Sequence, residues 1–210
     1  MDKHINKQHI YQMILSAILG VILTGLIVNG LETNARKQLL ATQEALAEEV
    51  LRFHVLANSN SDADQTLKLQ VKDEILTYME ESLGDEESVL YTKMWAENHK
   101  EEIEALSSAI IQQEGYDYSV DVELTKSYFP VKTYGDITFP EGEYEALKIE
   151  IGDAEGENWW CCLYPSLCFI DATCGVVSEE GKEDLQKVLT VEEYEMITTT
   201  TEFEISWFFF

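Results

Sequence analysis

Basic residues are scarce in this chain, which has 14 Lys and Arg residues against 40 Asp and Glu residues. The formal net charge is −26 at pH 7. Such a body repels the phosphate backbone, so the composition excludes a nucleic-acid-binding protein. The same charge disfavours contact with anionic lipid surfaces. An acidic surface mostly serves solubility, and the charge by itself therefore names no function.

The sequence also lacks the motifs that carry common catalytic chemistry. It has no G-x-S-x-G, H-E-x-x-H, phosphate-binding or dinucleotide-binding pattern. A cysteine nucleophile needs a nearby histidine. The candidates for such a pair are Cys161, Cys162, Cys168, His54 and His99. Their apolar neighbours favour buried, unreactive thiols. We therefore predict a protein that is not an enzyme and needs no cofactor, and we keep an extracytoplasmic cysteine-dependent enzyme or a cell-wall-binding module as the alternative.

Cysteine is rare as well, with four residues that all lie between Cys161 and Cys174. Their spacing lacks the paired C-x2-C of zinc sites, so the sequence predicts no metal centre. Outside the cytosol, cysteines this close together can form one or two disulfides, and buried reduced thiols fit the sequence equally well. The composition leaves both states open.

What the chain does have is an apolar run at its N-terminus. Residues 10–28 are apolar except for three polar side chains, and two lysines precede them. This approaches the roughly 20 residues that cross a bilayer as a helix, and it exceeds the roughly 7–15 residues of a typical signal-peptide core. A retained anchor and a cleaved signal both fit residues 1–30, and the length favours the anchor. The acidic body that follows is predicted to be exported.

The remaining chain is predicted to form a helical stalk over residues 31–50 and an extracytoplasmic domain over residues 51–210. Apolar periodicity predicts, in order, a half-buried strand at 50–57, helices at 62–84 and 88–114, strands at 116–124 and 144–151, a strand over the Trp-Trp-Cys stretch that pairs with the strand before it, a surface helix near 179–189 and a final strand at 198–210. This irregular succession predicts an α+β fold, with a mainly antiparallel sheet packed against two long helices.

Two local features point to a site. The stretch from Asn158 to Asp171 holds two adjacent tryptophans, three of the four cysteines and one of the three prolines, which predicts a core strand and its loop. The polar cluster from Asn58 to Gln65 follows a predicted buried strand, where binding residues are often displayed. Its acidic residues do not form the calcium-loop pattern, so helix capping is favoured over metal binding.

These two features belong to longer segments that resemble one protein family. The first segment runs from Leu51 to Ser61 (LRFHVLANSNS) and continues as D-Q-x-L-K-L-x-V-x-D from Asp64. The second runs from Pro140 to Gly152 and continues through G-x-N-W-W-C to L-C-F, with F-P-x-K-x-Y-G lying between the two segments. Over about residues 50–170 the chain resembles the stage II sporulation protein R family.

The resemblance implies an exported signal of endospore-forming bacteria that acts in the space between the two membranes of the developing spore. It implies a partner, a membrane-embedded aspartic protease of the mother cell that cleaves the pro-form of sigma-E. The apolar run itself predicts that residues 10–28 engage a membrane. Cys161 and Cys168 match the cysteine pair of the family and are the candidates for a disulfide, whereas Cys162 and Cys174 are additional.

On this interpretation we expect the turn that follows the first strand and the Trp-Trp loop to contact the partner. Exposed aromatic side chains would anchor such an interface, whereas buried ones would belong to the core. The candidate partner-binding residues are Arg52, His54, Asn58, Ser59, Asp64, Gln65, Asn158, Trp159 and Trp160.

Overall fold

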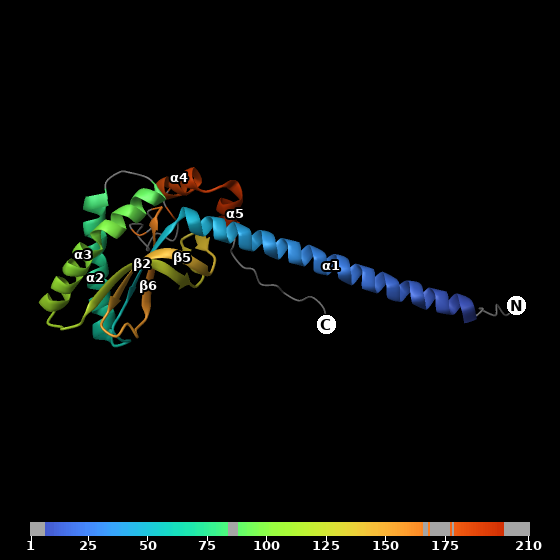
Figure 1. The fold of residues 1–210 in the computed structure, drawn as a ribbon, viewed down its shortest axis with the longest axis horizontal. Coiled ribbons are helices and arrows are strands. Elements are labelled where there is room, and N and C mark those ends of the chain that lie inside the picture. Colours follow the sequence, from blue (N-terminus) through green and yellow to red (C-terminus); the bar gives the residue numbers. More distant parts are fainter. Residues whose placement is uncertain (1–6, 84–87, 166–167, 169–176, 178, 200–210) are drawn as a thin grey trace. The chain divides into compact units, whose positions relative to one another are not determined.

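A computed structural model describes residues 7–83, 88–165, 168, 177 and 179–199. The chain divides into two units, Met1–Thr42 and Gln43–Phe210. Helix α1 spans Lys7–Glu49, so its last turns belong to the second unit (Figure 1).

The first unit is the apolar part of α1 and the helical segment that follows it. Its large apolar side chains are exposed. Among the described residues, α1 is the one helix whose length and composition suffice to cross a membrane, and a signal sequence near the N-terminus has the same properties. The second unit begins at Gln43 rather than at residue 51, because Leu46 and Val50 are fully buried in its core.

A four-stranded sheet forms the centre of the second unit, with the order β2-β5-β1-β6 (Figure 1). Strand β5 pairs parallel with β1 and antiparallel with β2, and β6 pairs antiparallel with β1. The predicted α+β fold with a mostly antiparallel sheet is confirmed. The strands are β1 (Leu51–Leu56), β2 (Val120–Phe129), β5 (Gly142–Ile151) and β6 (Asn158–Tyr164), and a separate ribbon pairs β3 (Lys132–Tyr134) with β4 (Ile137–Phe139).

Two predicted details of the sheet are wrong. Strand β6 does not pair with the preceding β5, because β1 lies between them, and Phe53 of β1 faces Leu147 on one side and Cys161 on the other. The strand predicted at 116–124 begins only at Val120 and runs on to Phe129. Tyr116 and Tyr118 precede the strand. Their rings stack on each other, with centroids 5.3 Å apart, and pack against the main core.

The two predicted long helices cover one face of the sheet. Helix α2 spans Asp62–Leu83 and helix α3 spans Val89–Gln113 (Figure 1). The stripe along α2 is buried against Phe53 and its neighbours, as the helical spacing of these apolar residues requires. Ser88 caps α3 by accepting a hydrogen bond from the N–H of Tyr91.

A second apolar cluster covers the opposite face of the sheet. It combines Leu46 and Val50 with the β3–β4 ribbon and with helices α4 (Glu179–Val188) and α5 (Val191–Thr199). Strand β1 is therefore buried on both faces rather than half-buried as predicted. The predicted final strand is wrong at Thr198, which lies in α5, and residues 200–210 of that prediction lie outside the described residues.

Candidate functional site

The two segments singled out in the sequence meet at one end of the sheet. The N–H of Glu155 donates to the carbonyl of Asn58 (3.2 Å), and the N–H of Gly156 donates to that of Ala57 (2.9 Å). The turn after β1 therefore lies directly against the loop that leads from β5 into β6. The sequence predicted each segment but not their contact.

Amide side chains of the turn reinforce this contact. Asn58 Oδ1 accepts the N–H of Asp153 (2.9 Å), and Asn60 Oδ1 accepts the N–H of Glu157 (2.7 Å). These side-chain oxygens accept hydrogen bonds from backbone N–H groups that would otherwise have no partner in an irregular loop. The asparagines thus hold the start of β6 in place.

Two glycines make the close approach possible. Gly152 has a φ of +61°, and a Cβ there would lie 2.2 Å from Asn58 Oδ1. A Cβ on Gly156 would lie 2.3 Å from the backbone oxygen of Ser59. Any side chain at these positions would push the loop away from the turn.

Asp64 is the carboxylate at the centre of the turn, and it is nearly fully buried. Its oxygens accept hydrogen bonds from Asn58 Nδ2 (3.0 Å), from the Ser59 hydroxyl and from Tyr118 OH (3.1 Å). The hydrogen bonds from Ser59 and then Asn58 hold the pKa of Asp64 below its usual value. The carboxylate is committed to the fold, and no group of three metal-ligating side chains occurs among the described residues.

Gln65 and Lys68 tie helix α2 to the same loop. Lys68 Nζ donates to the carbonyl of Glu157 (2.9 Å) and to Gln65 Oε1 (2.6 Å), while Gln65 Nε2 donates to the carbonyl of Ser59 (2.9 Å). Burial lowers the pKa of Lys68. Lys68 lies off the apolar stripe in the sequence, which gave no sign that its ammonium would be buried here.

Asn158, Trp159 and Trp160 begin strand β6, which confirms the strand predicted over the Trp-Trp-Cys stretch. Successive side chains of a strand point to opposite faces, so the two tryptophans serve different faces of the sheet. Trp159 packs edge-on against Phe53, with centroids 5.8 Å apart, and Lys72 Nζ lies 5.0 Å from its ring centroid. Both tryptophans are half-buried, so each is partly a core residue and partly a surface residue.

Trp160 packs on the opposite face of the sheet from Trp159. Its ring stacks on His54 with a centroid distance of 4.9 Å and an interplanar angle of 6°, and it meets the ring of Phe129 edge-on at 4.6 Å. Lys132 Nζ lies 5.6 Å from the same centroid. Lys132 was not proposed as a site residue, although it belongs to the F-P-x-K-x-Y-G motif that could have indicated it.

Arg52 lies beneath this cluster and is fully buried. Its Nε donates to the carbonyl of Cys161 (3.1 Å) and its Nη2 donates to Tyr134 OH (3.0 Å). No described carboxylate forms an ion pair with it. Four rings surround its guanidinium carbon at centroid distances of 4.5 to 5.8 Å, namely Phe129, Phe139, Tyr144 and Tyr134. These rings stabilise the buried cation electrostatically.

His54 is only 4% exposed, and neither of its ring nitrogens has a hydrogen-bond partner among the residues that the structure describes. Burial, together with the charges of Lys148 and Arg52, lowers the pKa of His54 to about 4. Arg52 and His54 are both buried, so neither side chain is exposed to a partner in this conformation. The polar half of β1 faces a second core that its alternating sequence did not predict.

The cysteines offer no thiolate in the described part of the chain. A disulfide joins Cys161 to Cys168, the pair that the family resemblance implies. Cys162 is a free, fully buried thiol, and burial raises its pKa to about 12. A thiol pair with His54 or His99 is therefore not formed by Cys161, Cys162 or Cys168.

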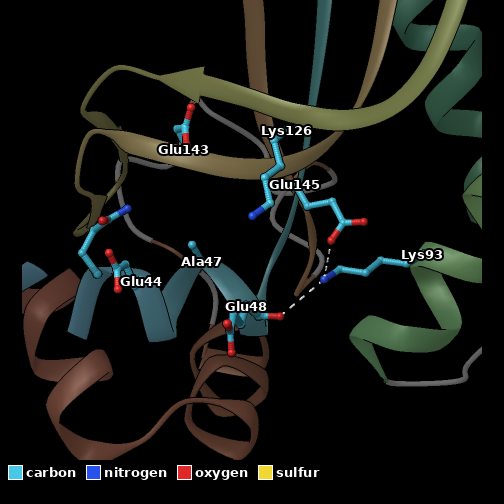
Figure 2. Close-up of a pocket in the computed structure, with 8 residues that line it drawn as sticks. Glu44, Ala47, Glu48, Lys93, Lys126, Glu143 and Glu145 are labelled. Atoms are coloured by element: carbon cyan, nitrogen blue, oxygen red, sulfur yellow. Dashed lines mark hydrogen bonds and ion pairs between the residues drawn. The ribbon is translucent and has the colours of Figure 1, made fainter. Parts of the chain in front are cut away.

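A separate polar pocket of about 540 Å³ lies beside the last turns of α1 (Figure 2). Lys93 Nζ forms an ion pair with Glu145 (2.9 Å) and donates to the carbonyl of Glu48 (3.5 Å) there. Its walls are mostly surface charges, without a buried unpartnered group, so we assign it no ligand. The lining residues are Gln43, Glu44, Ala47, Glu48, Lys93, Lys126, Glu143 and Glu145.

Known proteins match the part of the chain that builds this site. The profile of a family described as "Stage II sporulation protein R (spore_II_R)" matches residues 47–174. A Bacillus subtilis (strain 168) protein named "Stage II sporulation protein R" is 36% identical over 164 residues, which are 75% of this chain and 70% of that protein. No solved structure matches the chain.

Proposed function

The chain belongs to the stage II sporulation protein R family, and on this premise we propose that it is an exported signal that activates a membrane-embedded aspartic protease during sporulation. In this proposal the protease belongs to the mother cell and then cleaves the pro-form of sigma-E. Family membership is the observation that carries the proposal, and it gives the chain a role in sporulation.

Helix α1 supports export. Its apolar part is long enough to serve as a membrane anchor or as a signal sequence, and its large apolar side chains are exposed. We propose that it delivers the compact unit into the space between the two membranes of the developing spore, either anchored or secreted.

The chemistry of the cysteines supports a messenger that works by contact and not by catalysis. Cys161 and Cys168 are bonded to each other, and Cys162 keeps its proton at neutral pH because burial raises its pKa to about 12. A cysteine-dependent enzyme would need an accessible thiolate. The described cysteines thus favour activation of the protease through binding.

We propose the joined turn and loop as the contact surface. Asn58, Ser59 and Gln65 are half-buried, so part of each side chain faces solvent, while Asp64 holds the turn from within. Such a rigid surface loses little conformational entropy on binding. Trp159 and Trp160 continue it along β6, with the solvent-facing parts of their rings as aromatic anchors.

The test is processing of the sigma-E precursor in a Bacillus subtilis strain that lacks its own stage II sporulation protein R. The strain produces this chain together with the aspartic protease from the genome that encodes this chain, and an immunoblot follows cleavage of the precursor. We expect cleavage to return with the intact chain and to fail when residues 10–28 are deleted. Normal export of the intact chain without any cleavage would refute the proposal.

Asn58→Ala and Gln65→Ala test the surface itself. Glu97→Ala serves as the control, because Glu97 is an exposed residue of α3 whose ion pair within the described chain is with Lys100. We expect the two turn variants to slow cleavage and the control to leave it unchanged at equal exported amounts. Equal cleavage in all three variants would exclude the turn as the contact surface.

A further inference from the structure

Three buried polar atoms on one face of β1 have no hydrogen-bond partner within the described parts of the chain. They are Arg52 Nη1 and the two ring nitrogens of His54. Arg52 and His54 are two residues apart in a strand, so their side chains share a face. Buried polar groups are almost always paired, and this concentration therefore requires an explanation.

Arg52 Nη1 lacks an acceptor among the described residues, and an anion would supply one. The four aromatic rings around Arg52 offset its charge, but none of the groups in contact accepts a hydrogen bond from Nη1. Buried arginines usually pair with a carboxylate. This chain has 40 Asp and Glu residues, yet no described carboxylate forms an ion pair with Arg52.

A second unneutralised cation lies at the rim of the same cluster. Lys132 Nζ lies 5.6 Å from the ring centroid of Trp160 and forms no ion pair among the described residues. Trp160 is half-buried, and its ring stacks on His54 and also lies near Lys132 Nζ. The cluster is thus a basic site with an aromatic cover.

We propose that Arg52, His54, Trp160 and Lys132 form a site for one carboxylate of the partner protein, an inference that rests on the proposed function. The carboxylate approaches Lys132, the Trp160 ring turns aside, and the acid oxygens accept hydrogen bonds from Arg52 Nη1 and from the N–H of neutral His54. A guanidinium edge suits a carboxylate because its donors are planar and diverge at a fixed angle.

The net charge of the chain does not prevent this approach. At physiological salt, charges separated by more than about 8 Å are largely screened, so an entering acid responds mainly to the nearest groups. Those groups include Lys132 and Arg52, which are both positive and have no carboxylate of their own among the described residues. A tryptophan beside an arginine is also the combination that dominates many protein interfaces.

The test uses N-acetylglutamate methylamide as the probe and N-acetylglutamine methylamide as its uncharged match, both at fixed ionic strength. Full-length protein in detergent micelles is titrated while tryptophan fluorescence and the thermal unfolding midpoint are measured. We expect a saturable fluorescence change and a higher midpoint with the glutamate probe alone. Equal responses to both probes, no saturable response, or an equal response to sulfate would overturn the proposal.

Lys132→Gln and Lys126→Gln form a matched pair, because neither lysine has an ion pair among the described residues and Lys126 lines the separate polar pocket. We expect Lys132→Gln to weaken probe binding about fivefold, which is the loss of affinity expected when one exposed charge at the edge of a site is removed. Lys126→Gln should leave probe binding unchanged. Equal affinities for the two variants would refute a role for Lys132.

Arg52→Gln is expected to abolish probe binding, and its circular dichroism spectrum shows whether the variant folds. If it does not fold, the lysine pair still decides the question. The probe experiment is independent of sigma-E processing. Processing without probe binding refutes this inference alone, whereas probe binding without processing leaves the site standing and refutes the proposed function.

Discussion

Replacing His54 by Phe should remove a pH-dependent part of the stability of this domain. His54 is 4% exposed, stacks on Trp160 and offers no hydrogen bond from either ring nitrogen. Phenylalanine keeps a flat ring of similar size, so the variant loses no pairing that the histidine makes. At pH 7 we expect it to be at least as stable as the parent protein.

The magnitude follows from the pKa of His54, which burial lowers from 6.5 to about 4 in the folded protein. Between these two pH values the unfolded chain binds a proton that the folded chain does not. The free energy of unfolding therefore falls as the pH falls, by about 1.4 kcal/mol per pH unit and by about 3 kcal/mol in all. Above pH 6.5 this contribution is fully present, and below pH 4 it is fully lost.

Urea unfolding of the full chain in micelles, followed by tryptophan fluorescence at pH 7, 6, 5 and 4.5, measures this difference. Carboxylates titrate in the same range, but they are common to both proteins and cancel when the two curves are subtracted. We expect the advantage of His54→Phe to grow steadily as the pH falls. Parallel curves, or a variant that is much less stable at pH 7, would show that His54 is not held neutral and unpartnered.

Three further predictions concern the joined turn and loop and the disulfide. Asp64→Ala removes the acceptor for three side-chain donors. In urea unfolding it should lower the free energy of unfolding by about 2–4 kcal/mol, whereas the exposed control Glu97→Ala should change it by less than about 0.5 kcal/mol. Gly156→Ala places a Cβ 2.3 Å from the Ser59 carbonyl oxygen and should lower the thermal unfolding midpoint by several degrees. The control Gly30→Ala, whose Cβ would have nothing within 4 Å, should not lower it. Equal midpoints for the two variants would contradict the close contact. Reducing the disulfide, whose cysteines are 7 residues apart, should cost about 2.5 kcal/mol by chain entropy, and an unchanged urea midpoint in reductant would refute that value.

The helices could be predicted from the sequence because their stripes are local. Leu67, Val71 and Ile75 recur at helical spacing, and their burial requires only that something apolar lies opposite. Strand pairing is not local in this sense. The apolar sequence of β6 fits a neighbouring strand on either side, and only the full arrangement places β1 between β5 and β6.

The candidate site was predicted in its parts but not in its arrangement. Asn58 and Asp64 were expected at a binding turn, but their hydrogen bonds to Asp153 and Tyr118 join residues that lie far apart in the chain. The burial of Arg52 was missed for a related reason. Charged side chains at alternating positions of a strand normally indicate a solvent-exposed face of the sheet. Here the β3–β4 ribbon and helices α4 and α5 cover that face, and they come from distant segments of the chain.

The burial of Leu46 and Val50 also limits how proteolytic trimming can release the domain. The last turns of α1 are part of its core, so a cut after Leu46 would strip away packing and expose the apolar surface beneath. The small residues at 28–30 and 33–35 that a signal peptidase would accept lie ahead of Gln43, where the compact unit begins. A peptidase cutting there would leave the compact unit intact with a short helical leader, so an anchored form and a released form would share the same folded domain.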